Sequence, residues 1–382
     1  AMPRMGAAVA AVALAVCHPA AAMQALAQPV RAALGRGCEK APGSTYVVAV
    51  IFAGRRDRMA LTLTYLDNLV ETCAVDEVHL WNATRSKEDE EWLRGTAGRP
   101  AYTVFYDSDE PWMAAYRYYS PSSPHAPVTA EGKEVPHQFT PKWEGANGEN
   151  TVIVKLDDDI VYIDVAQFPC FVEYVRATPE MFLVHGNIVN NGVVAYYEAQ
   201  QDPELMRRMP ELAKYPQGVE QGSINGFNYT WVEYGFNGAL WEDAGLAARL
   251  HKYFVEDPSR FVHKRGPHGE RCIVFKSPKQ RSGQGRFSIN FFGARWAAWD
   301  KVALLVSSYP NQAYDEFALT AAATLVPGTT ECIFPSMVVA HLSFETQKDV
   351  VDAVALPLYK TLTAKTAAEF DDAPRQAGAS DC

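Results

Sequence analysis

Asp157, Asp158 and Asp159 interrupt the apolar stretch VIVKLDDDIVYID. A buried carboxylate without a partner is costly, and adjacent carboxylates also repel one another. Such a cluster therefore indicates a cation or a cationic substrate that neutralises it. Asp157 and Asp159 point the same way on an extended backbone, and their hard oxygen atoms suit Mg²⁺ or Mn²⁺. The alternative is a solvated acidic turn, but the Gly, Pro, Asn or Ser typical of a turn do not flank these acids.

The segments before the aspartates alternate between two patterns. Near-continuous apolar runs predict buried strands at 45–54, 75–82 and 101–109. Between them, residues 55–72 carry apolar side chains at helical spacing, and residues 87–95 show the pattern of a polar helix. This alternation predicts an α/β fold with a mostly parallel central sheet and flanking helices. The aspartates end the fourth strand, and open parallel sheets bind ligands at the carboxyl ends of strands.

The rest of the chain shows weaker patterns and no clear domain break. Residues 120–150 are rich in Pro, Gly and Ser, which predicts a long loop. Later strands are predicted at 181–192, where the strand runs into an Asn/Gly loop, at 272–275, at 286–292, where Gly293 stops the strand, and at 336–344. Later helices are predicted at 204–215, 241–254 and 313–325. We expect a single domain with insertions at 45–350, a targeting segment or N-terminal helix at 1–44, and a C-terminal tail at 351–382.

Composition narrows the possible partners. The chain has 382 residues, a formal net charge of −10 and a sequence pI of about 5.4. It has no basic stripe, which argues against a nucleic-acid partner. The seven cysteines show no zinc-ligand spacing, and the apolar neighbours of Cys73 and Cys170 predict small core side chains.

The N-terminal segment is rich in Ala and Val after an early arginine. It resembles a signal peptide, and an Ala-rich helix packed on the domain is the alternative. Because its apolar run is short for a membrane span, we expect any membrane association to occur through this segment alone. The expected location is the secretory pathway or Golgi, or bacterial envelope biosynthesis, with the cytoplasm as the alternative.

Four features occur in a definite order: the aspartate triplet at a strand end, a Gly-terminated strand, an acidic pair opening a helix, and a histidine in a late strand. Over roughly residues 45–345 this order resembles the GT-A fold glycosyltransferases, which are Rossmann-like and carry a DxD motif. The string KLDDDIVYID is similar to the KTDDDVFVN motif of the β-1,3-galactosyltransferase and Fringe-like group. The resemblance implies a metal-dependent enzyme of glycan biosynthesis. It would transfer a galactose-type hexose, as pyranose or furanose, from a UDP-sugar to a glycan hydroxyl acceptor with inversion.

The resemblance also assigns roles to individual residues. Metal binding falls to Asp159 directly, to Asp157 through water or the ribose, and to His341, which would otherwise be a core residue. Asp315 and Glu316 match the acidic pair that supplies the base, with Glu316 favoured. Their order is reversed relative to the family, which leaves the assignment open, and charge stabilisation of a helix start is the alternative. Nucleotide contacts are expected from the residues that follow strands or adjoin the triplet, namely Arg55, Arg56, Arg58, Asn82, Asp107, Lys155, Asp157 and Asp158.

Other classes of protein remain open. Residues 157–161 also match the DxDx[TV] signature of haloacid-dehalogenase-like phosphatases, with Asp157 as nucleophile, although that family places it on the first strand. A sugar-binding relative without activity and a glycosidase with two carboxylates are further alternatives. Asn187, Asn190 and Asn191 would either bind sugar hydroxyls or shape turns.

Overall fold

The structure is a computed structural model. It describes residues 40, 43–107, 111–122, 125–133, 135–136, 138–143, 145–213, 218–224, 227–233, 239–275, 287–308, 315–322 and 326–372. The described residues from Lys40 onward belong to one compact unit. Nearly all of the predicted N-terminal segment, 1–44, lies outside the described residues.

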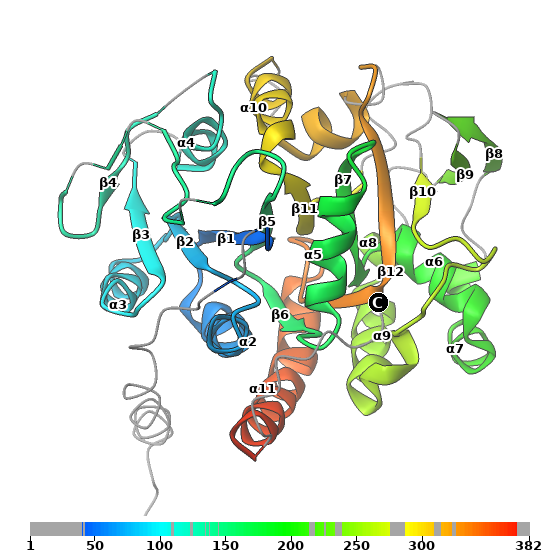
Figure 1. The fold of residues 1–382 in the computed structure, drawn as a ribbon. Coiled ribbons are helices and arrows are strands. Elements are labelled where there is room, and N and C mark those ends of the chain that lie inside the picture. Colours follow the sequence, from blue (N-terminus) through cyan, green and yellow to red (C-terminus); the bar gives the residue numbers. More distant parts are fainter. Residues whose placement is uncertain are drawn as a thin grey trace, which may run out of the picture. The chain divides into compact units, whose positions relative to one another are not determined.

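The described strands form one twelve-stranded mixed sheet with helices on its faces (Figure 1). Its centre contains four parallel strands in the order β3 (Tyr102–Tyr106), β2 (Glu77–Asn82), β1 (Tyr46–Ala53) and β5 (Thr151–Asp157). Antiparallel β11 (Phe291–Arg295) follows, and beyond it β7 (Met181–Val189) pairs in parallel with β12 (Thr330–His341). At one edge, β4 (Val128–Thr129) lies beside β3. At the other edge, β10 (Ile273–Phe275), β9 (Phe227–Glu233) and β8 (Gly218–Ile224) follow β12. The short strand β6 (Ile160–Ile163) also pairs with β12 but does not belong to this linear order.

The described helices pack over two clusters of buried residues. Helices α4 (Pro111–Tyr118) and α10 (Trp299–Ser308) cover a cluster that includes Trp81, Phe105 and Phe292. Helices α2 (Arg56–Glu71), α9 (Ala244–Glu256) and α11 (Lys348–Asp372) pack beside the other, around Val161, Phe254 and Tyr359. The remaining α-helices are α3 (Lys87–Thr96), α5 (Phe168–Ala177), α6 (Gly192–Gln201), α7 (Pro203–Arg208) and α8 (Ala239–Glu242). Short turns of helix lie at Pro210–Ala213, Pro258–Phe261, Trp296–Ala298 and, as a π-helix, Phe317–Ala322.

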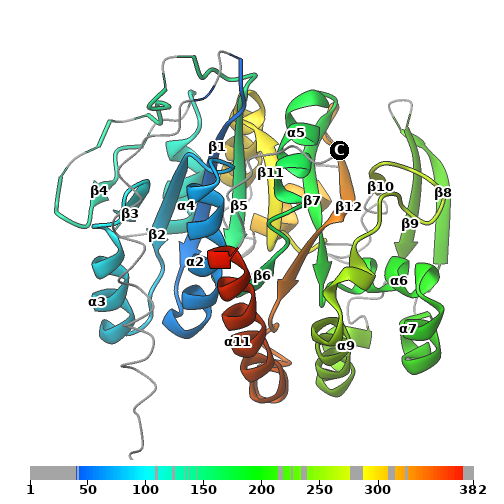
Figure 2. The same cartoon turned by 60° about the horizontal axis from the view of Figure 1, so that its bottom comes forward.

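The first half of the predicted element order is confirmed. Strands β1, β2 and β3 and helices α2 and α3 lie where apolar runs and helical spacing predicted them. Helices α4, α5 and α6 were not predicted. Helix α11 begins just before the predicted tail, 351–382, and runs through Asp372 beside α2 (Figure 2).

Gly293 does not stop a strand as predicted, because it lies inside β11. A Cβ at this position would lie 2.9 Å from a methyl group of Val175 and 3.0 Å from the ring of Phe171, both on α5. Glycine therefore allows α5 to pack directly on β11, and the strand continues past it to Arg295. Close helix–strand packing explains this glycine better than chain termination does.

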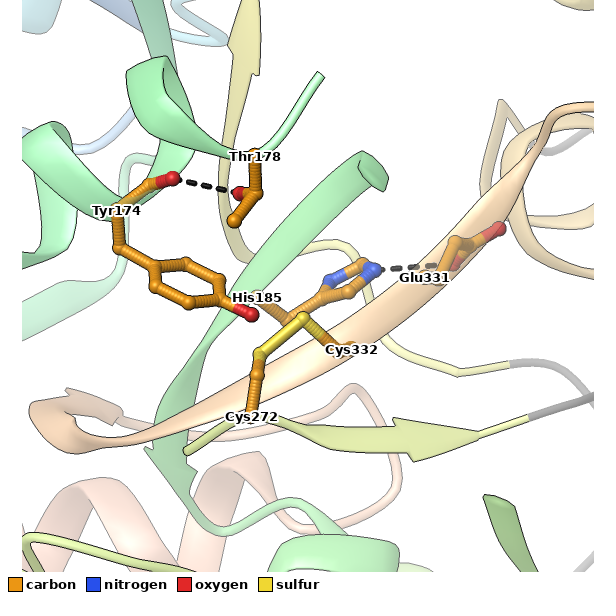
Figure 3. The surroundings of a disulfide bond; sticks show 6 residues. All are labelled: Tyr174, Thr178, His185, Cys272, Glu331 and Cys332. Carbon is orange, nitrogen blue, oxygen red and sulfur yellow. Dashed lines mark hydrogen bonds and ion pairs between the residues drawn. A yellow bond between two sulfur atoms is a disulfide. The ribbon is translucent and has the colours of Figure 1, made fainter. Parts of the chain in front are cut away.

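Cys170 is buried in the core, as predicted, whereas Cys73 is half-buried; both are disulfide-bonded, which was not predicted from the sequence. A further disulfide, Cys272–Cys332, links the chain just before β10 to β12 (Figure 3). It lies beside a buried pair in which Nε2 of His185 is 3.0 Å from Oε2 of Glu331.

Candidate active site

The aspartate triplet forms the turn between β5 and β6. Asp157 is the last residue of β5, at the carboxyl end of the parallel strands, and Ile160 begins β6. Strand pairing sets Asp157 opposite Phe52 at the end of β1, and Ile160 opposite His341 at the end of β12. The turn therefore lies between two strands that are far apart in the sequence, where an open sheet is expected to bind ligands.

Asp158 holds the turn to the end of β1. Nε of Arg55 donates to Oδ2 of Asp158 at 2.8 Å, and a second nitrogen of the same guanidinium donates to Oδ1, so the contact is bidentate. Burial raises the pKa of Asp158, although Arg55 acts against the increase. A Cβ on Gly54 would lie only 2.6 Å from Oδ2 of Asp158, so glycine is required for this close approach.

Asp159 is buried and shares one oxygen among three basic side chains. Its Oδ2 lies 2.8 Å from Arg55, 3.3 Å from Arg58 and 3.3 Å from Nε2 of His341. Burial alone would raise the pKa of Asp159, but His341 and the two arginines hold that pKa below its ordinary value. The carboxylate is therefore ionised, and the ion pairs join β1, α2 and β12.

Arg58 connects this cluster to the C-terminal helix. Its side chain is 2% exposed and donates both to Asp159 and to Asp352 of α11. Asp352 in turn accepts a hydrogen bond of 2.6 Å from the hydroxyl of Ser343. Helix α11 thus contributes a carboxylate that helps to orient the arginine that holds Asp159.

Asp157 is the most exposed of the three, with 26% of its side chain exposed. Nζ of Lys155 donates to its Oδ1, and Nδ2 of Asn290 donates to its Oδ2 at 2.7 Å. Lys155 also donates to the carbonyl of Ile289 at 3.0 Å and lies 5.1 Å from the centre of the Phe52 ring. Lys155 therefore offsets the negative charge of Asp157, and its expected contact with a nucleotide stays a prediction.

Asp315, the first residue of the predicted acidic pair, lies close enough to this cluster to interact electrostatically with Lys155 and Asp157. Burial raises the pKa of Asp315. The positive charge of Lys155 opposes this increase, and the negative charge of Asp157 adds to it. Oδ2 of Asp315 accepts a hydrogen bond of 2.7 Å from the hydroxyl of Tyr116 on α4, and Oδ1 accepts one of 2.9 Å from the backbone N–H of Glu316. Both oxygen atoms of Asp315 are thus oriented by the protein.

Arg56, Asn82 and Asp107 make their described contacts elsewhere. Arg56 is 54% exposed, with Nε 3.9 Å from a carboxylate oxygen of Asp89. The side-chain oxygen of Asn82 accepts from the backbone and hydroxyl of Thr84, which is a turn role. Asp107 contacts a ring nitrogen of His125. Nucleotide binding by these three residues stays a prediction.

The three asparagines considered for sugar hydroxyls make internal contacts. Asn187 donates to Glu198 and to two backbone carbonyls, and Asn191 caps α6. Asn190 donates to the carbonyl of Leu342 and to Gln347. The turn-forming alternative fits Asn190 and Asn191, which follow β7 and lead into α6, whereas Asn187 lies inside β7 and bonds to neighbouring segments.

Three residues of the site were missed by sequence reasoning. Asn290 had a weak signal, since it is a polar residue inside the apolar run RFSINFF. Tyr116 and Asp352 had none, because one belongs to an unpredicted helix and the other to the predicted tail. Their partners, Asp315 and Arg58, lie far away in sequence.

Asp157, Asp159 and His341, the expected metal ligands, suit a divalent cation by donor type and charge. They are not, however, arranged around a common point. Among the described residues, the carboxylates of Asp157, Asp158, Asp159, Asp315 and Asp352 outnumber the three permanent cations Lys155, Arg55 and Arg58. Carboxylate and imidazole groups are suitable ligands for Mn²⁺. No set of three His, Cys, Asp or Glu side chains in the described ranges is arranged around one point where an ion would bind. Asp159 and His341 are in contact, while Lys155 and Asn290 bind Asp157.

Searches against protein-family models and against curated proteins found no match to this chain. Within the part of the chain that the structure describes, no helix is both long and apolar enough to cross a membrane. The fold and the geometry of the site are therefore the basis for assigning a function.

Proposed function

We propose that this protein is a metal-dependent glycosyltransferase of the GT-A type. In this proposal it transfers a galactose-type hexose from a UDP-sugar to a hydroxyl of a glycan acceptor, with inversion. One observation carries the proposal: Asp159 contacts Arg55, Arg58 and His341, while Asp157 interacts electrostatically with Asp315. These residues come from separate segments and meet at the carboxyl end of the parallel strands.

The acidic pair supplies the general base in this proposal. A base removes the proton from the acceptor hydroxyl as the new glycosidic bond forms. Asp315 is held through both oxygen atoms by Tyr116 and by the N–H of Glu316, which suits an orienting role. Glu316 remains the favoured base, and its carboxylate would accept the proton.

The leaving diphosphate gains charge as the sugar departs, and cationic groups stabilise that charge. The Arg55 side chain is 24% exposed beside Asp158, and in this proposal it contacts a phosphate. A Mg²⁺ or Mn²⁺ ion held by Asp157, Asp159 and His341 would supply further neutralisation of the diphosphate. The surplus of carboxylates favours such an ion and disfavours a bare diphosphate.

The disulfides support the expected location. Cys272 and Cys332 are paired, and Cys73 and Cys170 are disulfide-bonded as well. Disulfides persist in oxidising compartments and are rare where thiols are kept reduced. We therefore propose the secretory pathway or a bacterial envelope as the place of action, with the glycan acceptor there.

Nucleotide binding with and without metal tests the proposal. A ligand that binds only the folded state raises the melting temperature. We expect UDP with Mn²⁺ to raise it and UDP with EDTA to raise it much less, and we expect slow hydrolysis of UDP-galactose with Mn²⁺. Equal stabilisation with and without metal would contradict metal dependence and assign the diphosphate to Arg55 and its neighbours. No stabilisation by any nucleotide-sugar would contradict the transferase.

The phosphatase remains a second candidate because Asp157, its nucleophile, is the most exposed of the three aspartates. Its reaction releases inorganic phosphate from sugar phosphates, which the transferase would leave intact. Asp157→Asn would abolish that release, because an amide does not replace the nucleophilic carboxylate. Phosphate release by the wild-type protein and none by the variant would favour this candidate.

A further inference from the structure

A series of aromatic contacts leads from the buried aspartates to the surface. Nε2 of His341 lies 3.3 Å from Asp159, and its ring packs on Phe344 with centroids 4.5 Å apart. Phe344 packs in turn on Trp241 of α8, with centroids 4.7 Å apart and the planes 43° apart. Trp241 is 38% exposed, so part of this large ring faces solvent only two ring contacts away from His341.

The backbone that carries Trp241 is fastened to the turn after His341. The hydroxyl of Thr346 donates to the carbonyl of Trp241 at 2.8 Å, and Nε2 of the buried Gln347 donates to the carbonyl of Leu240. Oε1 of Gln347 accepts from the backbone N–H of Phe344 at 3.0 Å. The exposed ring is therefore held in place by hydrogen bonds as well as by ring contacts.

Asn190 contributes further hydrogen bonds to the turn that holds Trp241. Asn190 has a φ of 74°, in the left-handed region that residues with a side chain adopt uncommonly. Its Nδ2 donates to Oε1 of Gln347 at 2.8 Å and to the carbonyl of Leu342 at 3.2 Å. Asn adopts this region more readily than most residues with a side chain, and these hydrogen bonds hold it there.

We propose that Trp241 is a stacking platform for a pyranose ring of the acceptor glycan. This inference rests on the proposed function, because it identifies the substrate of the same site. A pyranose presents an apolar face of C–H groups that packs on an aromatic ring, while its hydroxyls need polar neighbours. Asp243 is exposed two residues after Trp241, and Glu345 and Thr346 are exposed directly after Phe344, so polar groups are available near the ring.

The position of Trp241 favours the acceptor over the donor. Arg55, the cation expected to contact the diphosphate, follows β1 and contacts Asp159. His341, at the end of β12, contacts the same oxygen of Asp159, and Phe344 links its ring to Trp241 of α8. An acceptor on the tryptophan would therefore approach through the segment after β12, whereas the diphosphate would approach through the segment after β1.

Saturation-transfer NMR with methyl β-D-galactopyranoside and methyl β-D-glucopyranoside tests the platform. We expect transfer to the ring C–H protons of at least one glycoside in the wild-type protein. Trp241→Ala should weaken binding by about three- to tenfold, the usual value of one aromatic contact. Trp241→Phe should retain most of the binding, and Leu304→Ala, which truncates an exposed apolar residue on α10, should have no effect.

The outcomes separate this inference from the function on which it rests. Stabilisation by UDP with Mn²⁺ should be unchanged in Trp241→Ala. If UDP stabilises the protein but Trp241→Ala binds both glycosides as well as the wild type, the platform is refuted and the transferase stands. If neither glycoside binds the wild type, the platform is refuted as well. Glycoside binding that depends on Trp241 without any nucleotide effect would keep the platform and refute the transferase. A lower molar mass of Trp241→Ala in light scattering would place the ring between copies of the chain and refute the platform.

Discussion

Two buried carboxylate clusters lie at opposite ends of the parallel strands. Glu77 begins β2, whereas Asp157 ends β5. Glu77 accepts from the hydroxyl of Tyr46, lies 2.7 Å from Nζ of Lys142 and lies 3.1 Å from Nε2 of His79. One carboxylate there meets several donors, and aromatic rings surround His79.

The difference between the clusters lies in charge balance and access. The buried Glu77 carboxylate faces Lys142, His79 and the hydroxyl of Tyr46, which is typical of a polar network that stabilises a fold. In the aspartate cluster, the described carboxylates exceed the permanent cations, and Asp157 is partly exposed. Burial alone therefore does not identify the site. A surplus of carboxylates beside solvent is what supports the proposed site.

The largest effect is expected from Asp159→Ala. The change removes the carboxylate that Arg55, Arg58 and His341 share, so hydrolysis of UDP-galactose should fall below detection. Breaking a buried ion pair should also lower the free energy of unfolding by about 3 kcal/mol. Circular dichroism and urea unfolding test whether the variant is folded and how stable it is. Asp157→Asn, at the most exposed of the three aspartates, is the milder variant for comparison. Normal Mn²⁺-dependent turnover in Asp159→Ala would remove the aspartates from the mechanism.

A large kinetic effect is expected from Glu316→Gln. Loss of a general base typically lowers turnover by about 10²–10⁴-fold, while UDP binding should stay nearly unchanged. Asp315→Asn should act mainly on acceptor affinity or stability, because Asp315 is held by Tyr116. Steady-state rates of both variants separate the roles. If Asp315→Asn is the inactive variant, the assignments are exchanged, and normal rates in both would exclude this pair.

A substitution in the Glu77 cluster should change the stability of the protein without changing its catalytic activity. Burial would raise the pKa of Glu77, but His79 and Lys142 lower it to about 2. Because this pKa is below the ordinary value, the stabilisation is full above about pH 4.5 and is lost as the pH falls toward 2. Glu77→Gln should therefore cost about 3 kcal/mol at pH 7, about half of that at pH 3 and little at pH 2.

Urea unfolding of the wild type and Glu77→Gln across this range gives the difference directly. The comparison cancels the other carboxylates that titrate in the same range. A cost that is independent of pH would show that packing, and not charge, stabilises this cluster. A loss of UDP binding would contradict the separation between the two clusters.

A smaller and more local effect is expected from Gly54→Ala. Its new Cβ would lie 2.6 Å from Oδ2 of Asp158 and displace the carboxylate from Arg55. Overpacking of this kind costs about 1–3 kcal/mol, and UDP affinity should fall with it. Gly293→Ala is a matched control, since it crowds α5 to a similar degree but away from the aspartates. Equal UDP affinity of the two variants would show that Asp158 plays no part in binding.

The smallest effect is expected from Arg56→Gln. This side chain is 54% exposed, with Nε 3.9 Å from Asp89, and exposed ion pairs contribute less than about 1 kcal/mol. Stability and UDP binding should therefore remain within error in thermal-shift assays, whereas Arg55→Gln should weaken both. A large loss of UDP binding in Arg56→Gln would restore it to the nucleotide site.

Local patterns account for what could be predicted. The apolar run of β1 and the helical spacing of α2 depend on residues near one another in the chain, so these elements were predicted correctly. The placement of Asp157 at a strand end follows from the same local reasoning. Helix α4 was missed because its residues lie next to a stretch rich in turn-forming residues.

By itself, the sequence determined the strand-and-helix alternation and the acidic triplet at the end of β5, while the roles of Asp315 and His341 stay predictions. Only the tertiary structure decided which side chains meet there. Asn290 reaches Asp157 because β11 pairs antiparallel with β5, and Asp352 reaches Arg58 because α11 packs on α2. The physical reason is that periodicity and propensity act between neighbours in the chain. The order of strands and the docking of a distant helix depend instead on which apolar faces are buried against each other.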